Sequence, residues 1–407
     1  MLSWCRCLLF LGGLLTLFTT SCAPRQGVFF DEAIAPQLGP EAPLLPLYRA
    51  LAFNSNVVIL QIGDSHTAND SFSARMRELF QARFGDAGLG VLPPGVPSGG
   101  YRPARFSVTQ EGWSVVSSTD PDAAGPFGIT GLRQHAGGAA TMVLTVDDSN
   151  ELANVEIELL RQPRGGTIFA ALEHGSRAAI STNAPTQNAA WQPVPPAPGS
   201  HTLDGEALGD GPVDMLAWSI MRSRPGVVYA NLGRVGRWDP TIIRQELEHL
   251  NPSAIILTFG TDAGFRDNID VAAYGNNLAA RLRQLHAASP QAALLVLGPP
   301  DAYRRRPRHS AVPVACDNSE WTEPPNLVAI RQTERAVAPR ENAYFWDWQA
   351  AMGGPCSMLR WALTKPPMAA SDREHLLASG YRASAEALFR TIMNGYERYQ
   401  QALRPTS

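Results

Sequence analysis

The fold of this chain is indicated by residues 57–66, which read VVILQIGDSH. The first six of these residues are mostly apolar and β-branched, and their number suits a buried strand that ends at Gly63. Apolar residues then recur at helical spacing between Phe72 and Phe80. The pattern therefore predicts a strand, a tight turn that carries Ser65, and a helix.

The same alternation of strand and helix returns near the C-terminus. Buried strands are expected at 254–259, 293–297 and 344–348, with a helix over 271–285 and a closing helix over 377–399. Strands that alternate with helices form a parallel sheet covered on both faces. The sequence therefore predicts an α/β fold.

Residues 97–225 follow a different pattern. Apolar side chains alternate with glutamates over 155–159, as in a half-exposed strand, and a glycine pair at 165–166 predicts a turn. Helical periodicity is weak throughout this stretch. We expect an inserted all-β sandwich module here, with the α/β domain formed by 47–96 and 226–400.

The N-terminus has the composition of a targeting segment, residues 1–21 forming a signal peptide. Arg6 precedes an apolar run that is too short to span a membrane. The small residues before Cys22 resemble a bacterial lipoprotein cleavage motif, so we expect a lipid on Cys22 and an exported protein, anchored in the periplasm or outer membrane. Ordinary secretion is the alternative. Residues 22–46 contain many Pro and Gly and are expected to form a tether.

Two cysteines remain once Cys22 is lipidated and the signal peptide is removed. These are Cys316 and Cys356, and an oxidising compartment favours a disulfide between them. Two free buried thiols are the alternative.

The composition excludes one class of protein. With 407 residues, 44% of them hydrophobic, the chain can bury a sizeable core. Its formal net charge of -3 lacks the basic excess of nucleic-acid-binding proteins. The histidines form no cluster with metal-ligand spacing, so no metal is expected.

The candidate catalytic residues lie in two separate segments. Ser65 follows the end of a predicted strand, where it is exposed at the sheet edge and faces the positive end of the next helix. The late segment Asp372-Arg373-Glu374-His375 places a carboxylate three residues before an imidazole that it can orient. Acyl transfer needs such a nucleophile and base. A helix cap at Asp64-Ser65 is the simpler alternative, and His66, which lacks an acidic partner, is expected to be structural or to line the pocket.

These segments resemble a known family. Residues 63–66, 260–262 and 372–375 are similar to the first, third and fifth blocks of the SGNH hydrolases. With 84–90, 345–354 and the inserted module, the similarity extends to the bacterial peptidoglycan O-acetylesterases of that family. The resemblance implies a flavodoxin-like three-layer fold, an esterase without metal or cofactor, and a module like a carbohydrate-binding β-sandwich.

The resemblance also implies roles for individual residues. Ser65 would be the nucleophile, His375 the general base and Asp372 the residue that orients the base. The oxyanion would be bound by the N–H groups of Ser65 and Gly236, Gly233 being the alternative to Gly236. The implied substrate is an acetylated cell-envelope polysaccharide, namely peptidoglycan; another acetylated glycan and acetyl transfer stay open.

Two positions depart from the family pattern. Val235 stands where the second block has an asparagine, and Asp262 stands where the third block has the asparagine that donates to the oxyanion. An ionised carboxylate only accepts hydrogen bonds and would repel an oxyanion. It could donate only if burial or neighbouring negative charge kept it protonated. The rival hypothesis is therefore a glycan-binding protein without catalysis.

Overall fold

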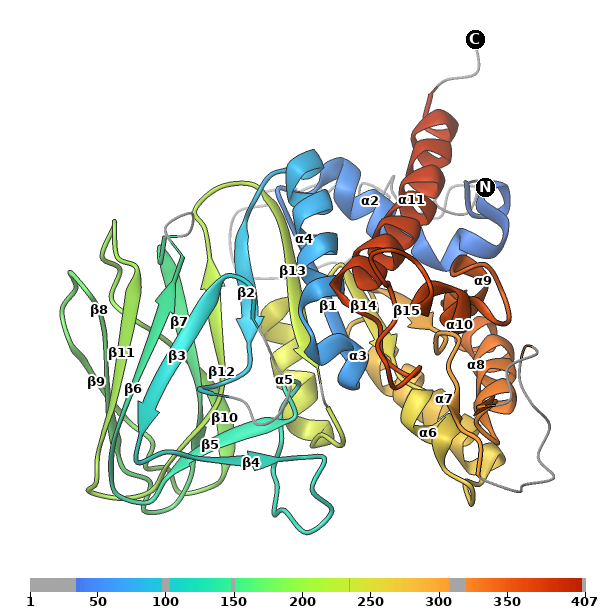
Figure 1. Ribbon diagram of the computed structural model, residues 1–407. Coiled ribbons are helices and arrows are strands. Elements are labelled where there is room, and N and C mark those ends of the chain that lie inside the picture. Colours follow the sequence, from blue (N-terminus) through green and yellow to red (C-terminus); the bar gives the residue numbers. More distant parts are fainter. Residues whose placement is uncertain are drawn as a thin grey trace, which may run out of the picture.

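The computed structural model describes residues 34–96, 103–147, 151–233, 235–307, 316 and 320–404 (Figure 1). The α/β part and the β-rich part lie side by side in Figure 1. The signal peptide, Cys22 and the start of the expected tether lie outside the described residues.

A parallel sheet forms the centre of the α/β part. Its strand order is β13-β1-β14-β15-β18, and every neighbouring pair is parallel. The strands are β1 (Asn56–Gly63), β13 (Gly226–Gly233), β14 (Ala254–Thr258), β15 (Ala293–Leu297) and β18 (Ala343–Trp346). The strands are almost wholly buried, as expected for a sheet that is covered on both faces. The predicted α/β fold is confirmed.

Helices cover both faces of this sheet and give three layers. One core joins the sheet to α2, α4 and α11, and a second core joins its other face to α5, α7 and α8. These helices are α2 (Leu45–Phe53), α4 (Ser71–Phe84), α5 (Pro240–Leu250), α7 (Val271–Ala288), α8 (Leu327–Arg340) and α11 (Ala378–Ala402). The long α11 crosses the face that carries α2 and α4 (Figure 1).

The inserted module is a sandwich of two antiparallel sheets around its own core. One sheet has the order β10-β7-β12-β5-β4, and the other has the order β3-β6-β11-β8-β9. The strands are β3 (Phe106–Glu111), β4 (Ser114–Ser117), β5 (Leu132–Ala136), β6 (Ala139–Val146), β7 (Asn154–Arg161), β8 (Thr167–Leu172), β9 (Ala178–Ser181), β10 (Asn188–Pro193), β11 (Thr202–Leu208) and β12 (Val213–Met221). Strand β2 (Gly88–Leu92) precedes the expected boundary at 97, yet it pairs with β12.

The expected tether over 22–46 is wrong for residues 34–46. A helical stretch at 34–38 and the 3₁₀ helix η1 (Gly39–Leu44) lead directly into α2. Ile34, Leu38 and Leu44 are buried in the core that contains α11, so apolar burial outweighs the Pro and Gly content of this stretch. Within the described ranges, no helix is long and apolar enough to cross a membrane.

Short elements at the carboxyl ends of the strands carry the candidate residues. Helix α3 (Ser65–Ala68) follows β1, and α6 (Thr261–Phe265) follows β14. The strand expected at 344–348 ends at Trp346, because Asp347 caps the next helix, α9 (Trp348–Ala351), by accepting from the N–H of Ala350. The remaining short elements are α10 (Ser357–Ala362), β16 (Arg304–Arg305) and β17 (Trp321–Thr322).

Candidate active site

The turn after β1 presents Ser65 at the end of the sheet. Gly63 fits because a Cβ at this position would lie 2.1 Å from the Thr67 hydroxyl and 2.6 Å from the Thr258 carbonyl oxygen. Asp64 caps α3, its carboxylate accepting from the N–H of His66 at 3.0 Å. Ser65 is thus the first residue of α3 and is only half-buried.

The late segment brings an imidazole and a carboxylate to this serine. The Nε2 atom of His375 lies 2.9 Å from the Oγ atom of Ser65, across 310 residues of sequence. The Nδ1 atom of His375 lies 2.9 Å from one carboxylate oxygen of Asp372, whose other oxygen accepts from the N–H of His375 at 3.0 Å. The three predicted residues therefore form a continuous hydrogen-bonded chain.

The charges of this chain suit general base catalysis. Partial burial raises the pKa of Asp372, but hydrogen bonds from the side chain and backbone of His375 outweigh it and hold that pKa below its usual range. The hydrogen bond to Asp372 raises the pKa of His375 above its usual value, and burial opposes this in part. An ionised Asp372 directs the Nδ1 proton of His375 toward itself and leaves Nε2 free to accept the Ser65 proton.

A cavity of about 400 Å³ opens at the serine. It contains the predicted residues Ser65, His375 and Asp262, and its full lining is Ser65, Ala68, Asn69, Asp262, Glu374, His375, Leu376 and Tyr381. Asn69, Glu374 and Tyr381 were not predicted as site residues. Their only sequence signal is nearness to the two catalytic segments, since each lies within six residues of Ser65 or His375.

Two carboxyl groups, Asp262 and Glu374, line this cavity, and Asp64 lies next to Ser65. Burial, and then the charge of Asp262, raise the pKa of Asp64 to about 7. Burial also raises the pKa of Glu374, with Asp262 and Asp372 adding to the shift and His375 opposing it. The side chain of Asp262 itself is exposed. Across the described ranges, no three His, Cys, Asp or Glu side chains are grouped to hold a metal ion.

The structure does not bring Gly236 to the cavity. Its N–H donates to the Ser118 hydroxyl at 3.0 Å, and Ser118 belongs to the inserted module. Its carbonyl accepts from the Arg281 side chain, so both backbone polar groups of Gly236 are already engaged. The alternative, Gly233, lies nearer to α3: a Cβ on it would be 2.4 Å from the backbone nitrogen of Ala68.

A disulfide supports the segment that carries the base. Cys316 and Cys356 are joined, and the Tyr303 hydroxyl accepts from the N–H of Cys356 at 2.9 Å. The N–H of Tyr303 donates to the carbonyl of Arg373 at 2.8 Å, inside the Asp372-to-His375 segment. Tyr303 therefore connects the disulfide to the backbone that positions the base.

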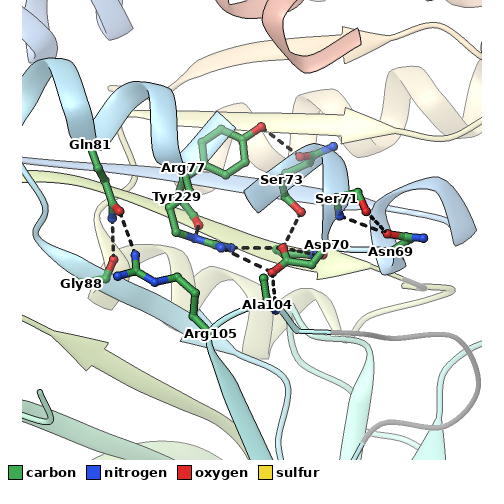
Figure 2. A network of polar contacts seen from close by, with 12 residues as sticks. Asn69, Asp70, Ser71, Ser73, Arg77, Gln81, Gly88, Ala104, Arg105 and Tyr229 are labelled. Carbon is green, nitrogen blue, oxygen red and sulfur yellow. Dashed lines mark hydrogen bonds and ion pairs between the residues drawn. The ribbon is translucent and has the colours of Figure 1, made fainter. Parts of the chain in front are cut away.

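A buried polar network supports the segment after the nucleophile (Figure 2). The Asp70 carboxylate pairs with Arg77 at 3.3 Å and accepts from Ser73, Asn231 and the N–H of Ala104. Burial raises the pKa of Asp70, but Arg77 and the hydrogen bonds outweigh it and lower that pKa. The ionised Asp70 carboxylate thus links α4, β13 and the backbone at Ala104, near the start of the inserted module.

Comparison with solved structures gives an extensive match. A solved structure of a peptidoglycan O-acetylesterase superposes with a TM-score of 0.71 at 26% identity, covering 87% of this chain and 96% of that chain. A family two carbohydrate esterase from Clostridium thermocellum gives a TM-score of 0.29 at 9% identity, covering 70% and 100%. A carbohydrate-binding module of Cellvibrio mixtus lichenase 5A gives 0.20 at 17% identity, covering 28% and 91%. These two scores are too low to carry an argument.

No family model and no curated protein matches the chain. The match with the peptidoglycan O-acetylesterase extends over 87% of this chain, so it is not confined to one short motif. In fold and overall likeness, the chain is similar to a peptidoglycan O-acetylesterase, which is a carboxylic ester hydrolase, and its three-layer fold with a parallel sheet is the one expected of SGNH-type hydrolases.

Proposed function

We propose that this protein is a carbohydrate O-acetylesterase of the cell envelope and that its substrate is O-acetylated peptidoglycan. The observation that carries the proposal is the chain from Ser65 through His375 to Asp372, with 2.9 Å at each contact and a cavity at the serine. The likeness to a peptidoglycan O-acetylesterase supports this choice of substrate. An acetyl group on a glycan hydroxyl is small enough for a cavity of about 400 Å³ that opens to solvent.

In the first half of the proposed reaction, Ser65 becomes acetylated. Its Oγ atom attacks the acetyl carbonyl carbon while Nε2 of His375 takes the hydroxyl proton. The charge that develops on His375 is stabilised by Asp372. The tetrahedral intermediate then collapses, the bond to the sugar oxygen breaks, and His375 returns the proton to that oxygen.

In the second half, water releases the acetyl group. His375 removes a proton from the water, whose oxygen attacks the acetyl carbonyl carbon. The bond to the Ser65 oxygen breaks, and His375 protonates that oxygen. The products are acetate and the free serine, so no cofactor is consumed.

Oxyanion binding is the weaker part of this proposed mechanism. The N–H of Ser65, at the start of α3, is available as a donor. Asp262 lines the cavity, and its side chain is exposed. We propose that the Ser65 N–H binds the oxyanion and that the Asp262 carboxylate, when ionised, weakens this binding.

We also propose that the protein is exported and carries a lipid on Cys22. The support is the sequence of the first 22 residues, where a short apolar run is followed by small residues and a cysteine. Such an anchor would hold the enzyme next to the cell wall. Membrane partition of the native protein, lost in Cys22→Ser, would test it; a mature N-terminus elsewhere without lipid would contradict it.

The test of the function is acetate release from O-acetylated peptidoglycan by the native protein and by Ser65→Ala. Acetylated xylan serves as a second substrate, and Ser379→Ala, an exposed serine on α11, serves as the control. Release by the native protein and the control, but not by Ser65→Ala, supports the proposal. Faster release from xylan would contradict the peptidoglycan assignment. Sedimentation with peptidoglycan without release of acetate would favour the glycan-binding hypothesis.

A further inference from the structure

His66, the residue after the nucleophile, is buried against the base. Its side chain is 1% exposed, and its ring centre lies 5.1 Å from that of His375, with the planes 36° apart. Both ring nitrogens of His375 are already engaged, by Ser65 and by Asp372. The contact between the two imidazoles is therefore one of packing, which restricts how far the ring of His375 can move.

Tyr381 connects His66 to the segment that carries the base. Its hydroxyl lies 3.0 Å from Nδ1 of His66. Tyr381 stands at the start of α11, six residues after His375, so this contact links the segment that carries the base to the residue after Ser65.

Aromatic side chains enclose this contact. The ring of Trp348 lies 5.6 Å from His66 and 6.4 Å from Tyr381, and Phe72 packs against Trp348 at 5.2 Å. Burial, and then the charge of His375, lower the pKa of His66 to about 3, so its ring is neutral. A neutral ring can accept from Tyr381 and adds no charge beside the base.

We propose that His66 and Tyr381 act as one clamp that holds Ser65 and His375 at reacting distance. The proposal rests on the esterase function proposed above. The two segments are 310 residues apart in sequence, and the clamp adds a second connection between them besides the Ser65–His375 contact itself. Small displacements of a catalytic group reduce the rate strongly, by about 100-fold for 1 Å. In the clamp, His66 and Tyr381 are positioning residues that act through Ser65 and His375, and Tyr381 also lines the cavity.

The test compares His66→Phe, Tyr381→Phe and the double variant. Each single change removes the hydrogen bond and keeps an aromatic ring, so we expect kcat to fall by about 10- to 100-fold with KM little changed. The double variant should lose no more than the larger single loss, because either change breaks the same connection. His66→Asn offers an oxygen as acceptor and should recover part of the rate. Tyr396→Phe, another buried tyrosine of α11, is the matched control and should keep native kcat.

Several outcomes would overturn the clamp. Native kcat in Tyr381→Phe would do so, as would losses that multiply in the double variant. If His66→Phe fails to fold, Tyr381→Phe, which removes a single oxygen, still decides the matter. The rate at which a serine-directed reagent labels Ser65 gives a second readout that needs no acetyl substrate, and it should fall in parallel with kcat. If the native protein is labelled but releases no acetate, the proposed function is contradicted. The labelling rates of the variants still test the clamp in that case.

Discussion

The two sides of the cavity differ in how well they match the needs of ester hydrolysis. On one side, Ser65, His375 and Asp372 form a complete chain with 2.9 Å contacts. On the other side, the exposed side chain of Asp262 lines the wall. The N–H of Gly236, which the family resemblance implies as an oxyanion donor, lies outside the cavity lining and donates to Ser118. The residues that would activate the nucleophile are thus all in place, whereas the groups that the family resemblance implies for oxyanion binding are a carboxyl group and an N–H that is already engaged.

The difference follows from what holds each side in place. The chain of Ser65, His375 and Asp372 depends on the short local motif Asp372-x-x-His375, on the Ser65–His375 contact and on the proposed clamp. Oxyanion binding depends on the direction of single N–H groups, which distant neighbours can set. The Gly236 N–H, implied as such a donor by the family resemblance, has its partner in a serine of the inserted module. A single change outside the triad can therefore alter the oxyanion side and leave the triad intact.

The largest effect is expected from removing the nucleophile. Ser65→Ala should lower kcat by about 10⁴- to 10⁶-fold, since the remaining residues can form no acyl-enzyme. Acetate release and thermal unfolding measured on the same preparation check this. A loss that appears only together with a lowered unfolding temperature would point to damage of the fold instead.

The second effect concerns the residue that orients the base. Asp372→Asn should lower kcat by about 10⁴-fold, because the amide stabilises neither the required tautomer nor the charged ring. In the native protein kcat/KM should rise with pH through a pKa above the usual value of histidine, since His375 acts when neutral and Asp372 raises its pKa. The rising limb of the residual activity should move to lower pH in the variant. An unmoved limb would show that another group sets it.

The third effect tests the oxyanion side directly. Asp262→Asn replaces a negative acceptor by a donor and should raise kcat by about 10- to 100-fold. Asp262→Ala removes the carboxylate without adding a donor, so its gain in kcat should be smaller. The ratio of kcat in Asp262→Asn to kcat in Asp262→Ala then measures the effect of the added donor alone. Lower activity in Asp262→Asn than in the native protein would show that the carboxyl group itself assists the reaction.

The smallest effect is expected at the contact between module and oxyanion side. Ser118→Ala removes the acceptor that holds the Gly236 N–H. If the Gly236 N–H turns toward the oxyanion during the reaction, it must first break its hydrogen bond with Ser118, which costs about 1 kcal/mol. The variant does not have this cost, so its kcat should rise about fivefold. Thr119→Ala, at the neighbouring exposed residue, is the control. An unchanged kcat in Ser118→Ala would mean that Gly236 takes no part.

Local patterns predicted the strands and the position of Ser65 well. The strand expected at 293–297 has those bounds in the structure, because a buried parallel strand needs only a short apolar run between turns. The pairing of His375 with Asp372 could also be predicted, because the two residues are only three positions apart in the sequence. The partner of Gly236 could not be predicted, since Ser118 is 118 residues away and belongs to another unit. Tyr381 was missed for a similar reason, because its contact with His66 spans 315 residues.

If Cys22 carries the proposed lipid, the packing of residues 34–53 against the core would limit how far from the membrane the enzyme could work. Eleven residues, 23–33, lie between Cys22 and Ile34, the first residue buried in the core. The twelve steps from Cys22 to Ile34 span at most about 40 Å even when fully extended. A lipid on Cys22 would therefore confine the enzyme to the glycan strands closest to the bilayer, and strands in the outer part of a wall would be processed only by enzymes with longer linkers.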